Sequence, residues 1–389
     1  MTWSCSGEGE RFLIVRDPHL LAGDYARFGI GVLPILQYFD GQSTLEDIRV
    51  DLAKQGAGFL DVALLQGVAD ALDRFYLLDN DTFRAEMRDR DGFRSSPVRR
   101  AAHAGTAYPA DPTEARAFFD AMLALAEAPP RAPLRRLVAP HIDLGLGAEV
   151  YAHAHRRLAA AGRPDVVVVL GVRHEYGERR FVACRKDFAT PLGTVRHDAA
   201  FLDALERDAR DDLGQGVAAH RREHSVEFQA CWLAHLWPED PPPMVPLLVG
   251  SFHDFVEKGE TPGGNPEVEA FVAALNAALE GRRAVVIASV DFAHLGPMYD
   301  QPEGLDADGE RRMAEEDEVL LDHVAANSAE EFFAAVAADG NGRNVCGLAA
   351  TYLALRLGEG PGERLRYGQG RIHPESGSVV SFAAVAFPD

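Results

Sequence analysis

Three short apolar runs in this chain each lead, within a few residues, to a histidine. The runs and their histidines are 137–139 with His141, 166–170 with His174, and 285–290 with His294. Short runs rich in valine, isoleucine and leucine, bounded by glycine or proline, are typical of buried strands in a parallel sheet. In open α/β folds, the groups that follow the carboxyl ends of such strands converge on one crevice. We therefore predict a parallel sheet whose strand ends bring these histidines into one site.

The side chains around these strand ends are suited to holding a metal ion. Neutral imidazole is a good ligand for zinc, iron and copper, and two histidines with one carboxylate form the usual facial set for non-haem Fe(II). His141 and His174 supply the imidazoles, and a fourth histidine, His224, lies in a charged segment between the second and third runs. His224 and His294 are candidates for further ligands or for acid–base groups. The candidate carboxylates are Asp143, Glu175 and Asp291.

Composition narrows the class of protein. At 389 residues the chain is longer than one average domain, so we expect two. A net charge of −21 argues against sequence-independent electrostatic binding to nucleic acid or to an anionic membrane, so neither is expected as a partner. The four cysteines are widely spaced, which fits a reducing compartment. No leader pattern and no apolar run near the roughly 20 residues of a membrane helix occurs, so we expect a cytoplasmic protein.

Residues 1–85 have the pattern of a small separate module. Its predicted elements are strands at 12–15 and 77–78, helices at 30–39 and 61–75, and a further helix that begins at 43–46 with a capping-box pattern. Helices around a small β element predict a winged-helix-like α+β domain. Residues 86–97 are charged and non-periodic, which predicts a linker, and we assign the short basic cluster of Arg94, Arg99 and Arg100 to this region. From 98 to 389, strand-like and helix-like segments alternate, which predicts an α/β domain with a mostly parallel central sheet.

The N-terminal module resembles the PqqD-like family, whose peptide-binding modules accompany radical-SAM enzymes that modify peptides. The resemblance rests on residues 39–48, Phe-Asp-Gly-Gln-Ser-Thr-Leu-Glu-Asp-Ile, and on residues 72–78, Leu-Asp-Arg-Phe-Tyr-Leu-Leu. It implies a module that delivers a peptide to a modifying system. A generic helical extension is the alternative interpretation of these short patterns.

The rest of the chain resembles the Memo family, the "B" component of the AmmeMemoRadiSam system. Eight segments carry the resemblance, in the family's order, at 102–109, 139–141, 170–174, 190–193, 223–227, 246–250, 289–294 and 377–382. The resemblance implies a fold like that of the class III extradiol dioxygenases, which are non-haem iron enzymes. It also implies two functional partners, a radical-SAM protein and the "A" component of the same system.

The resemblance assigns roles to individual residues. His141 and His174 match the imidazole ligands of a metal, which the family associates with iron or copper; Fe(II), copper and zinc all suit such ligands. The third ligand in animal-type members is a cysteine, which we place in the position before the final histidine. That position is Ala293 here, and alanine cannot coordinate a metal. A metal would then be held by two histidines and water, or would recruit Asp291, His224 or His294.

Other residues are expected to line the same pocket. Glu227 follows His224 by three residues, so the two share one face if a helix begins there. His103 and Tyr108 lie in the Ala-Gly-x-x-Tyr-Pro type of segment and are predicted to form a wall of the pocket. Cys346 precedes the last helix, where a lowered thiol pKa is one interpretation. We interpret it as a small buried residue instead.

The sequence is compatible with two functions. The first is a metal-dependent, dioxygenase-like enzyme with His224, His294 and Asp291 as catalytic groups, acting with a radical-SAM partner on a small molecule or a peptide. The second is a non-catalytic binding or scaffold protein on a vestigial dioxygenase fold, which Ala293 favours. Ordinary catechol ring cleavage is disfavoured by the same alanine.

Overall fold

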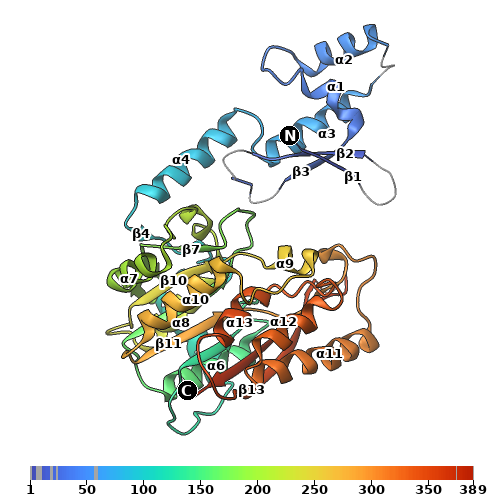
Figure 1. Cartoon of the computed structure of the whole chain (residues 1–389). Coiled ribbons are helices and arrows are strands. Elements are labelled where there is room, and N and C mark those ends of the chain that lie inside the picture. Colours follow the sequence, from blue (N-terminus) through green and yellow to red (C-terminus); the bar gives the residue numbers. More distant parts are fainter. Residues whose placement is uncertain are drawn as a thin grey trace. The chain divides into compact units, whose positions relative to one another are not determined.

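The computed structural model describes residues 2–5, 11–17, 21–22, 25–56, 60–373 and 375–388 (Figure 1). The chain divides into two compact units. The first comprises Met1–Ser95 with the short segment His174–Glu178, and the second comprises Ser96–Arg173 with Arg179–Asp389. Each unit is described here by itself.

The first unit combines a three-stranded antiparallel sheet with helices. Its elements are β1 (Thr2–Cys5), β2 (Arg11–Val15), β3 (Ala26–Gly29), the 3-10 turn η1 (Ile30–Val32), α1 (Leu33–Leu36), α2 (Leu45–Lys54), α3 (Val62–Arg74) and α4 (Asp81–Ser95). Buried Leu13 of β2 packs in one cluster with Ile48 of α2 and Leu65 of α3. This cluster joins the apolar faces of the helices to the sheet, and it accounts for the periodic spacing seen in the sequence.

The predicted strand at 77–78 is wrong. Helix α3 ends in a turn at Tyr76, which has a left-handed φ of 54°, and the Leu77 N–H donates to the Leu72 carbonyl at 2.8 Å. This is the hydrogen-bonding pattern of a Schellman helix end. Asn80 then accepts from the Phe83 N–H at 3.0 Å and opens the next helix. Most of the segment predicted as a linker, 86–97, is the second half of that helix, α4.

The second unit is built on a central eight-stranded sheet with a smaller sheet beside it. Its strands are β4 (Val98–Arg99), β5 (Arg136–Ala139), β6 (Val166–Val172), β7 (Phe181–Ala183), β8 (Asp187–Thr190), β9 (Gly193–Val195), β10 (Met244–Val249), β11 (Ala284–Ser289), β12 (His294–Leu295), β13 (Glu363–His373) and β14 (Ser378–Phe387). The central sheet runs β12-β14-β5-β11-β6-β10-β7, and β13 pairs with β14; β4, β8 and β9 form the smaller sheet. The four inner strands β5, β11, β6 and β10 are parallel, and the outer pairings are antiparallel.

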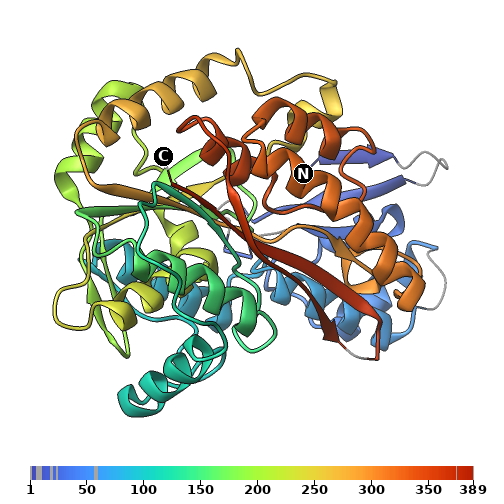
Figure 2. The same ribbon diagram turned by 90° about the horizontal axis from the view of Figure 1, so that it is seen from below.

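Helices cover both faces of the central sheet. They are α5 (Pro112–Leu123), α6 (Ala148–Ala160), α7 (Ala199–Ala209), η2 (Val217–His220), α8 (His224–Leu236), α9 (His253–Lys258), α10 (Pro266–Leu279), η3 (Pro297–Tyr299), α11 (Ala307–Ala325), α12 (Ala329–Ala337) and α13 (Leu348–Leu355). Helices α6 and α8 pack on one face, and α13 packs on the other, where α7, α10 and α12 share its apolar core. Figure 2 shows the green helix α6 on one side of the long red strands and the red helix α13 on the other. None of the helices in the described ranges has the length and apolar character of a membrane span.

The architecture confirms the predicted α/β class and its parallel core. The inner strands β5, β6 and β11 are those predicted from the three apolar runs, because each is buried along its whole length, as β10 is also. The long strand β13 was missed, because half-exposed polar residues such as Arg366 and Gln369 interrupt its apolar pattern. The sheet is therefore mixed, with antiparallel strands at both sides of a parallel centre.

Helix α8 approaches strand β6 closely where the strand ends. The Ser225 hydroxyl donates to the Val172 carbonyl at 3.2 Å and accepts from the Val172 N–H at 3.1 Å. A Cβ at Gly171 would lie 2.5 Å from the Ser225 oxygen and 2.7 Å from a methyl carbon of Val226. Only glycine leaves room for this contact, which fixes the beginning of α8 against the end of β6.

We expect Gly171→Ala to lower the free energy of unfolding by about 1–3 kcal/mol, the usual cost of an overpacked core. Urea titration followed by far-ultraviolet circular dichroism measures it. The matched control is Gly67→Ala in α3, where a Cβ would meet nothing within 4 Å. There the helix-interior glycine should make alanine neutral or stabilising by about 0.5–1 kcal/mol. Equal unfolding curves for Gly171→Ala and the parent protein would contradict the close-packing argument.

Candidate metal centre

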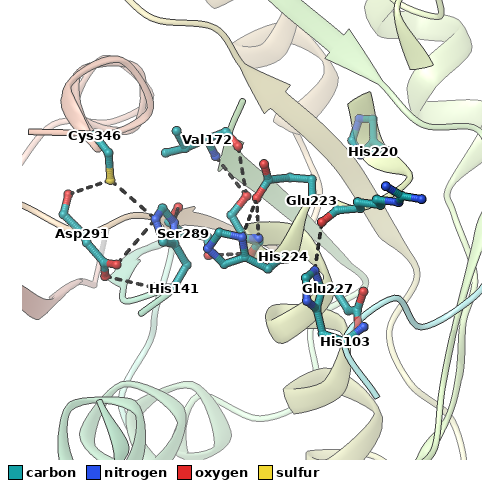
Figure 3. Close-up of polar contacts among 12 residues, drawn as sticks. His103, His141, Val172, His220, Glu223, His224, Glu227, Ser289, Asp291 and Cys346 are labelled. Atoms are coloured by element: carbon teal, nitrogen blue, oxygen red, sulfur yellow. Dashed lines mark hydrogen bonds and ion pairs between the residues drawn. The ribbon is translucent and has the colours of Figure 1, made fainter. Parts of the chain in front are cut away.

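Three neighbouring strands deliver side chains to one edge of the sheet. Strand β11 lies between β5 and β6, and all three are parallel, so their carboxyl ends meet at that edge. His141 follows β5 by two residues, Asp291 follows β11 by two, and His174 follows β6 by two. Figure 3 shows His141 and Asp291 facing each other below Cys346.

His141 is held in one ring orientation. Its Nδ1 lies 2.7 Å from the Ser289 carbonyl oxygen, and because a carbonyl can only accept, Nδ1 carries the hydrogen. In the neutral ring the lone pair is then on Nε2, which lies 3.5 Å from the Cys346 sulfur and 3.5 Å from Asp291 Oδ2. In metal-ligating histidines, the ring nitrogen that does not bind the metal commonly donates such a hydrogen bond, which orients the ring. The side chain is 2% exposed, so the ring is a pre-oriented, buried donor.

Asp291 organises the backbone around this histidine. Its Oδ1 accepts from the backbone N–H groups of His141 at 3.1 Å and Ile142 at 3.2 Å. Its Oδ2 faces His141 Nε2, and the residue is 2% exposed. The carboxylate therefore fixes the turn after β5 and adds a negative charge at the site, which favours a bound cation.

Cys346 reaches the site through a tight contact between two loops. Its sulfur lies 3.5 Å from the Asp291 carbonyl oxygen, and the Gly347 N–H donates to the same oxygen at 3.1 Å. A Cβ at Gly347 would lie 2.6 Å from that oxygen, so a larger residue would push the cysteine away. Burial, and then the Asp291 charge, raise the pKa of Cys346 well above its ordinary value. The thiol thus keeps its proton at neutral pH unless a metal ion displaces it.

His174 completes a group of three possible metal ligands. One donor atom each from His141, His174 and Cys346 lie within 4.8 Å of one another. A second group, formed by His174, Glu223 and His224, meets the same criterion. In the first group, two imidazoles and a thiol are a donor set that suits iron, copper or zinc.

Ala293 does not occupy a position facing these donors. It is fully buried in an apolar cluster with Met313 and Val379, and its N–H donates to the Ser381 hydroxyl at 3.0 Å. The assignment of Ala293 to the third-ligand position of the family stays a prediction, and its surroundings in this chain are apolar. The thiol that lies beside His141 is that of Cys346, 3.5 Å from Nε2, and from the sequence this cysteine was expected to be a packing residue. The signal that could have found it is the Val-Cys-Gly turn directly before a helix.

His224 and Glu223 form a pair at the first turn of α8. The Glu223 carboxylate accepts from the Ser225 N–H at 2.8 Å and lies 3.3 Å from His224 Nδ1. The His224 ring is one-third exposed, and its centroid lies 5.1 Å from that of His141. His224 thus lies beside His141 of the first group, partly open to solvent, with the Glu223 carboxylate 3.3 Å from its Nδ1.

Glu227 lies one turn further along α8 and has a structural role. Its side chain is 1% exposed and pairs with the buried guanidinium of Arg99. It also accepts from the Ala102 N–H and the His103 N–H, each at 2.9 Å, and from the Tyr108 hydroxyl. Burial alone would raise the pKa of Glu227, but Arg99 and these hydrogen bonds lower it below its ordinary value.

Arg99 was wrongly assigned to a linker. It is fully buried, and besides Glu227 it donates to the carbonyls of His220 at 3.1 Å and Glu223 at 2.9 Å. The local sequence could not show this, because its partners lie more than 120 residues away.

The other predicted residues lie around these groups. The His103 ring lies edge-on to that of His224 at 5.9 Å, and buried Tyr108 lies edge-on to Phe228. His294 opens the edge strand β12, its Nδ1 lies 3.0 Å from the Phe292 carbonyl, and its ring contacts Tyr299. It belongs to neither ligand group found among the described residues. Asp143 instead caps a turn, accepting from the N–H groups of Gly145 and Leu146, and Glu175 is in neither group.

Gln229 is a buried positioning residue that the sequence did not reveal. Its amide nitrogen donates to the Pro140 carbonyl at 3.0 Å and to the Ser289 hydroxyl at 2.9 Å. Pro140 precedes His141, and Ser289 carries the carbonyl that orients its ring. Gln229 also contacts Nε2 of buried His155 at 3.0 Å. Helix α8 thereby supports His141 from behind.

Comparison with known proteins identifies relatives along most of the chain. Residues 99–386 match the family model described as Memo-like protein. A MEMO1 family protein of Methanopyrus kandleri is 32% identical over 304 residues, covering 74% of this chain and 98% of its own length. A MEMO1 family protein of Aquifex aeolicus is 27% identical over 385 residues, covering 97% of this chain and 96% of its own. The latter similarity therefore extends through the N-terminal unit.

Replacing Glu227 with glutamine should destabilise the protein by about 3–5 kcal/mol at pH 7, because Arg99 would keep a buried charge without its counter-charge. The lowered pKa of Glu227 means that its contribution is complete above the unfolded value of about 4.3 and is lost as the pH falls through the lower folded value. Urea unfolding of both proteins at several pH values measures the difference. Tyr108→Phe, which removes one hydrogen bond and keeps the ion pair, should cost only about 1 kcal/mol. A pH-independent difference for Glu227→Gln would contradict this account.

Proposed function

The chain belongs to the Memo-like protein family, and we propose that His141, His174 and Cys346 hold an iron-type metal ion in a pocket that acts on a small molecule or a peptide. The observation that carries the proposal is the convergence of three donor atoms within 4.8 Å at the carboxyl edge of the sheet. Such strand ends are where open α/β folds bind ligands.

The residues present fit a metal ion by their chemistry. His141 offers Nε2 because its other nitrogen is bonded to a carbonyl, and the Cys346 thiol lies 3.5 Å from that Nε2. Two imidazoles and a thiolate suit Fe(II), copper or zinc better than magnesium or calcium, which prefer oxygen ligands. A bound iron would supply a redox-active Lewis acid to the pocket.

The neighbouring residues have separable roles in this proposal. Asp291 holds the turn that carries His141 and balances the charge of a cation. His224, oriented by Glu223, is the acid–base group, because its ring lies next to His141 and is partly open to solvent. Glu227 is excluded from proton transfer to a ligand, since Arg99, Tyr108 and two backbone N–H groups already surround it.

The N-terminal unit is proposed to be a PqqD-like, winged-helix-like module that presents a peptide. Support comes from its small antiparallel sheet with packed helices and from the sequence patterns at 39–48 and 72–78. In this proposal a radical-SAM protein and the "A" component of the AmmeMemoRadiSam system are the partners. The free thiols of Cys184, Cys231 and Cys346 are in keeping with a reducing, cytoplasmic location.

The metal assignment predicts a specific pattern among cysteine variants. Protein purified without oxygen should contain about one metal ion per chain, and Cys346→Ala should lose most of it, as should His141→Ala. Ala293→Cys should gain nothing, because that side chain lies in an apolar cluster. Cys184→Ala is the matched control, a buried thiol outside both ligand groups. Elemental analysis by mass spectrometry measures the metal content of the parent protein and of the four variants.

Two outcomes would count against the proposal. Metal-free parent protein under every loading condition would favour a binding or scaffold protein on a vestigial dioxygenase fold. Metal retained in Cys346→Ala but increased in Ala293→Cys would restore the original assignment of the third ligand.

The N-terminal unit can be tested separately. Peptides encoded beside this chain's gene should bind the full chain, measured by fluorescence anisotropy, and a deletion of residues 1–80 should abolish the binding. Metal content should survive the deletion if the second unit and the 174–178 segment keep their fold. Binding that is indifferent to the deletion would remove the peptide-presenting role and leave the metal proposal intact.

A further inference from the structure

The amino-terminal edge of the central sheet carries a concentration of arginines in a strongly acidic protein. Two cavities of about 600 and about 450 Å³ adjoin there, and both are lined by Arg135, Arg283 and Ala284. The first lies beside the start of β11 and the end of α10, and the second beside the segment before β5. Six arginines line the pair: Arg131, Arg135, Arg136, Arg163, Arg282 and Arg283.

We propose that these adjoining cavities form a binding site for a small polyphosphate, separate from the histidine and cysteine cluster. Guanidinium groups donate two parallel hydrogen bonds to phosphate oxygens, and a cluster of them is the usual protein device for that ligand. Each volume lies within the range of small-molecule sites.

Several guanidinium donors in the cavities are not used inside the protein. Arg283 donates hydrogen bonds from Nε and Nη2 to Asp165, and Arg282 donates one from Nη1 to Asp198 at 3.2 Å. Arg135 donates Nη1 to the Arg282 carbonyl at 2.8 Å. No carboxylate lies within 4.0 Å of Arg131 or Arg135 in the described part of the chain. Arg163 pairs with Asp240 at 2.9 Å, and Arg136 donates to Asn327 and to the carbonyls of Ala354 and Glu359. Arg131 and Arg135 are therefore the cavity arginines that lack a counter-charge in the described part of the chain.

The charge balance of the cavity walls opposes that of the whole protein. Glu280 is the one acid among the described residues that line the first cavity, and the second has none. The chain as a whole has a net charge of −21, so a local excess of positive charge is not a consequence of composition. Three of the six arginines are paired with aspartates outside the lining, Arg163 with Asp240, Arg282 with Asp198 and Arg283 with Asp165. The excess therefore rests on Arg131, Arg135 and Arg136 against Glu280, and it favours an anion.

The walls also discriminate between classes of phosphate ligand. The apolar lining consists of aliphatic residues, among them Leu279, Val286 and Leu357 in the first cavity and Leu134 in the second, and no described aromatic side chain lines either. A nucleobase would find no ring to stack on, although stacking supplies much of the affinity for bases. The site therefore favours a compact ligand bound through charge, such as pyrophosphate or a sugar bisphosphate, over a nucleotide.

The site is independent of the proposed metal centre. It adjoins the first residues of β5 and β11, whereas His141 and Asp291 follow their last residues. A six-residue strand separates the two edges by roughly 20 Å. Variants of one site should consequently leave the other unaffected.

Isothermal titration of the full chain with pyrophosphate at low ionic strength, with EDTA present, tests the proposal. The parent protein should bind pyrophosphate more tightly than inorganic phosphate. ATP should bind no more tightly than pyrophosphate, because its base finds no ring to stack on. Arg135→Gln combined with Arg283→Gln should weaken pyrophosphate binding at least tenfold. The matched control is Arg207→Gln combined with Arg311→Gln, which removes two exposed arginines that lie outside both cavities. His141→Ala should leave the affinity unchanged.

Three results would overturn the proposal. Absence of pyrophosphate binding by the folded parent protein at concentrations up to roughly 1 mM, the weak end of the affinity scale, would exclude the site. Equal affinity in the Arg135/Arg283 double variant would place the ligand elsewhere. Binding of a glutamate-rich peptide that is lost in the Arg135/Arg283 double variant, with no heat from pyrophosphate, would identify the face as a docking surface for an acidic protein instead.

Discussion

The buried ion pair between Arg99 and Glu227 is the constraint on which the second unit's candidate site depends. Both side chains are about 1% exposed, so each charge is tolerable only because the other is present and because further hydrogen bonds surround them. Through this pair, β4 and the segment around His103 are attached to the first turns of α8. The same turns carry Glu223 and His224. The acid–base pair of the proposed pocket is therefore placed by an interaction that makes no contact with a substrate.

A second constraint is the close approach of backbone segments at two glycines. Gly171 admits the Ser225 hydroxyl to the end of β6, and Gly347 admits the Cys346 loop to the Asp291 carbonyl. Neither contact involves a large buried area, yet both determine where the donor atoms lie. Gln229 adds a third support by bonding Pro140 and Ser289 on either side of His141. The site is thus assembled by short-range geometry around strand ends.

How much the sequence could predict follows from the range of the interactions. The inner strands were predictable because a strand buried on both faces is apolar along its length, and the residues after such strands share an edge. Cys346 was not predictable in this way, since its position depends on a contact between loops 55 residues apart. Arg99 was misassigned for the same reason, because local composition cannot show a partner 128 residues away. The strand expected at 77–78 was wrong for another reason. Its apolar residues do pack against the core, but they follow a helix end and not a turn into a sheet.

The two edges of the sheet present opposite chemistry, and the acidic composition explains why this matters. At the carboxyl edge, Asp291 and Glu223 accompany the imidazoles and the thiol, so that edge attracts cations. At the amino edge, arginines outnumber the acids that line the cavities, so that edge attracts anions. A parallel sheet produces such a polarity readily, because all of its strands begin on one side and end on the other. Acidic side chains at the first edge are expected in a chain with a net charge of −21. The second edge instead gathers arginines from the first residue of β5 and from the segments that precede β5, β6 and β11. The arginine cluster is therefore the less expected of the two features, and the one that composition alone explains least.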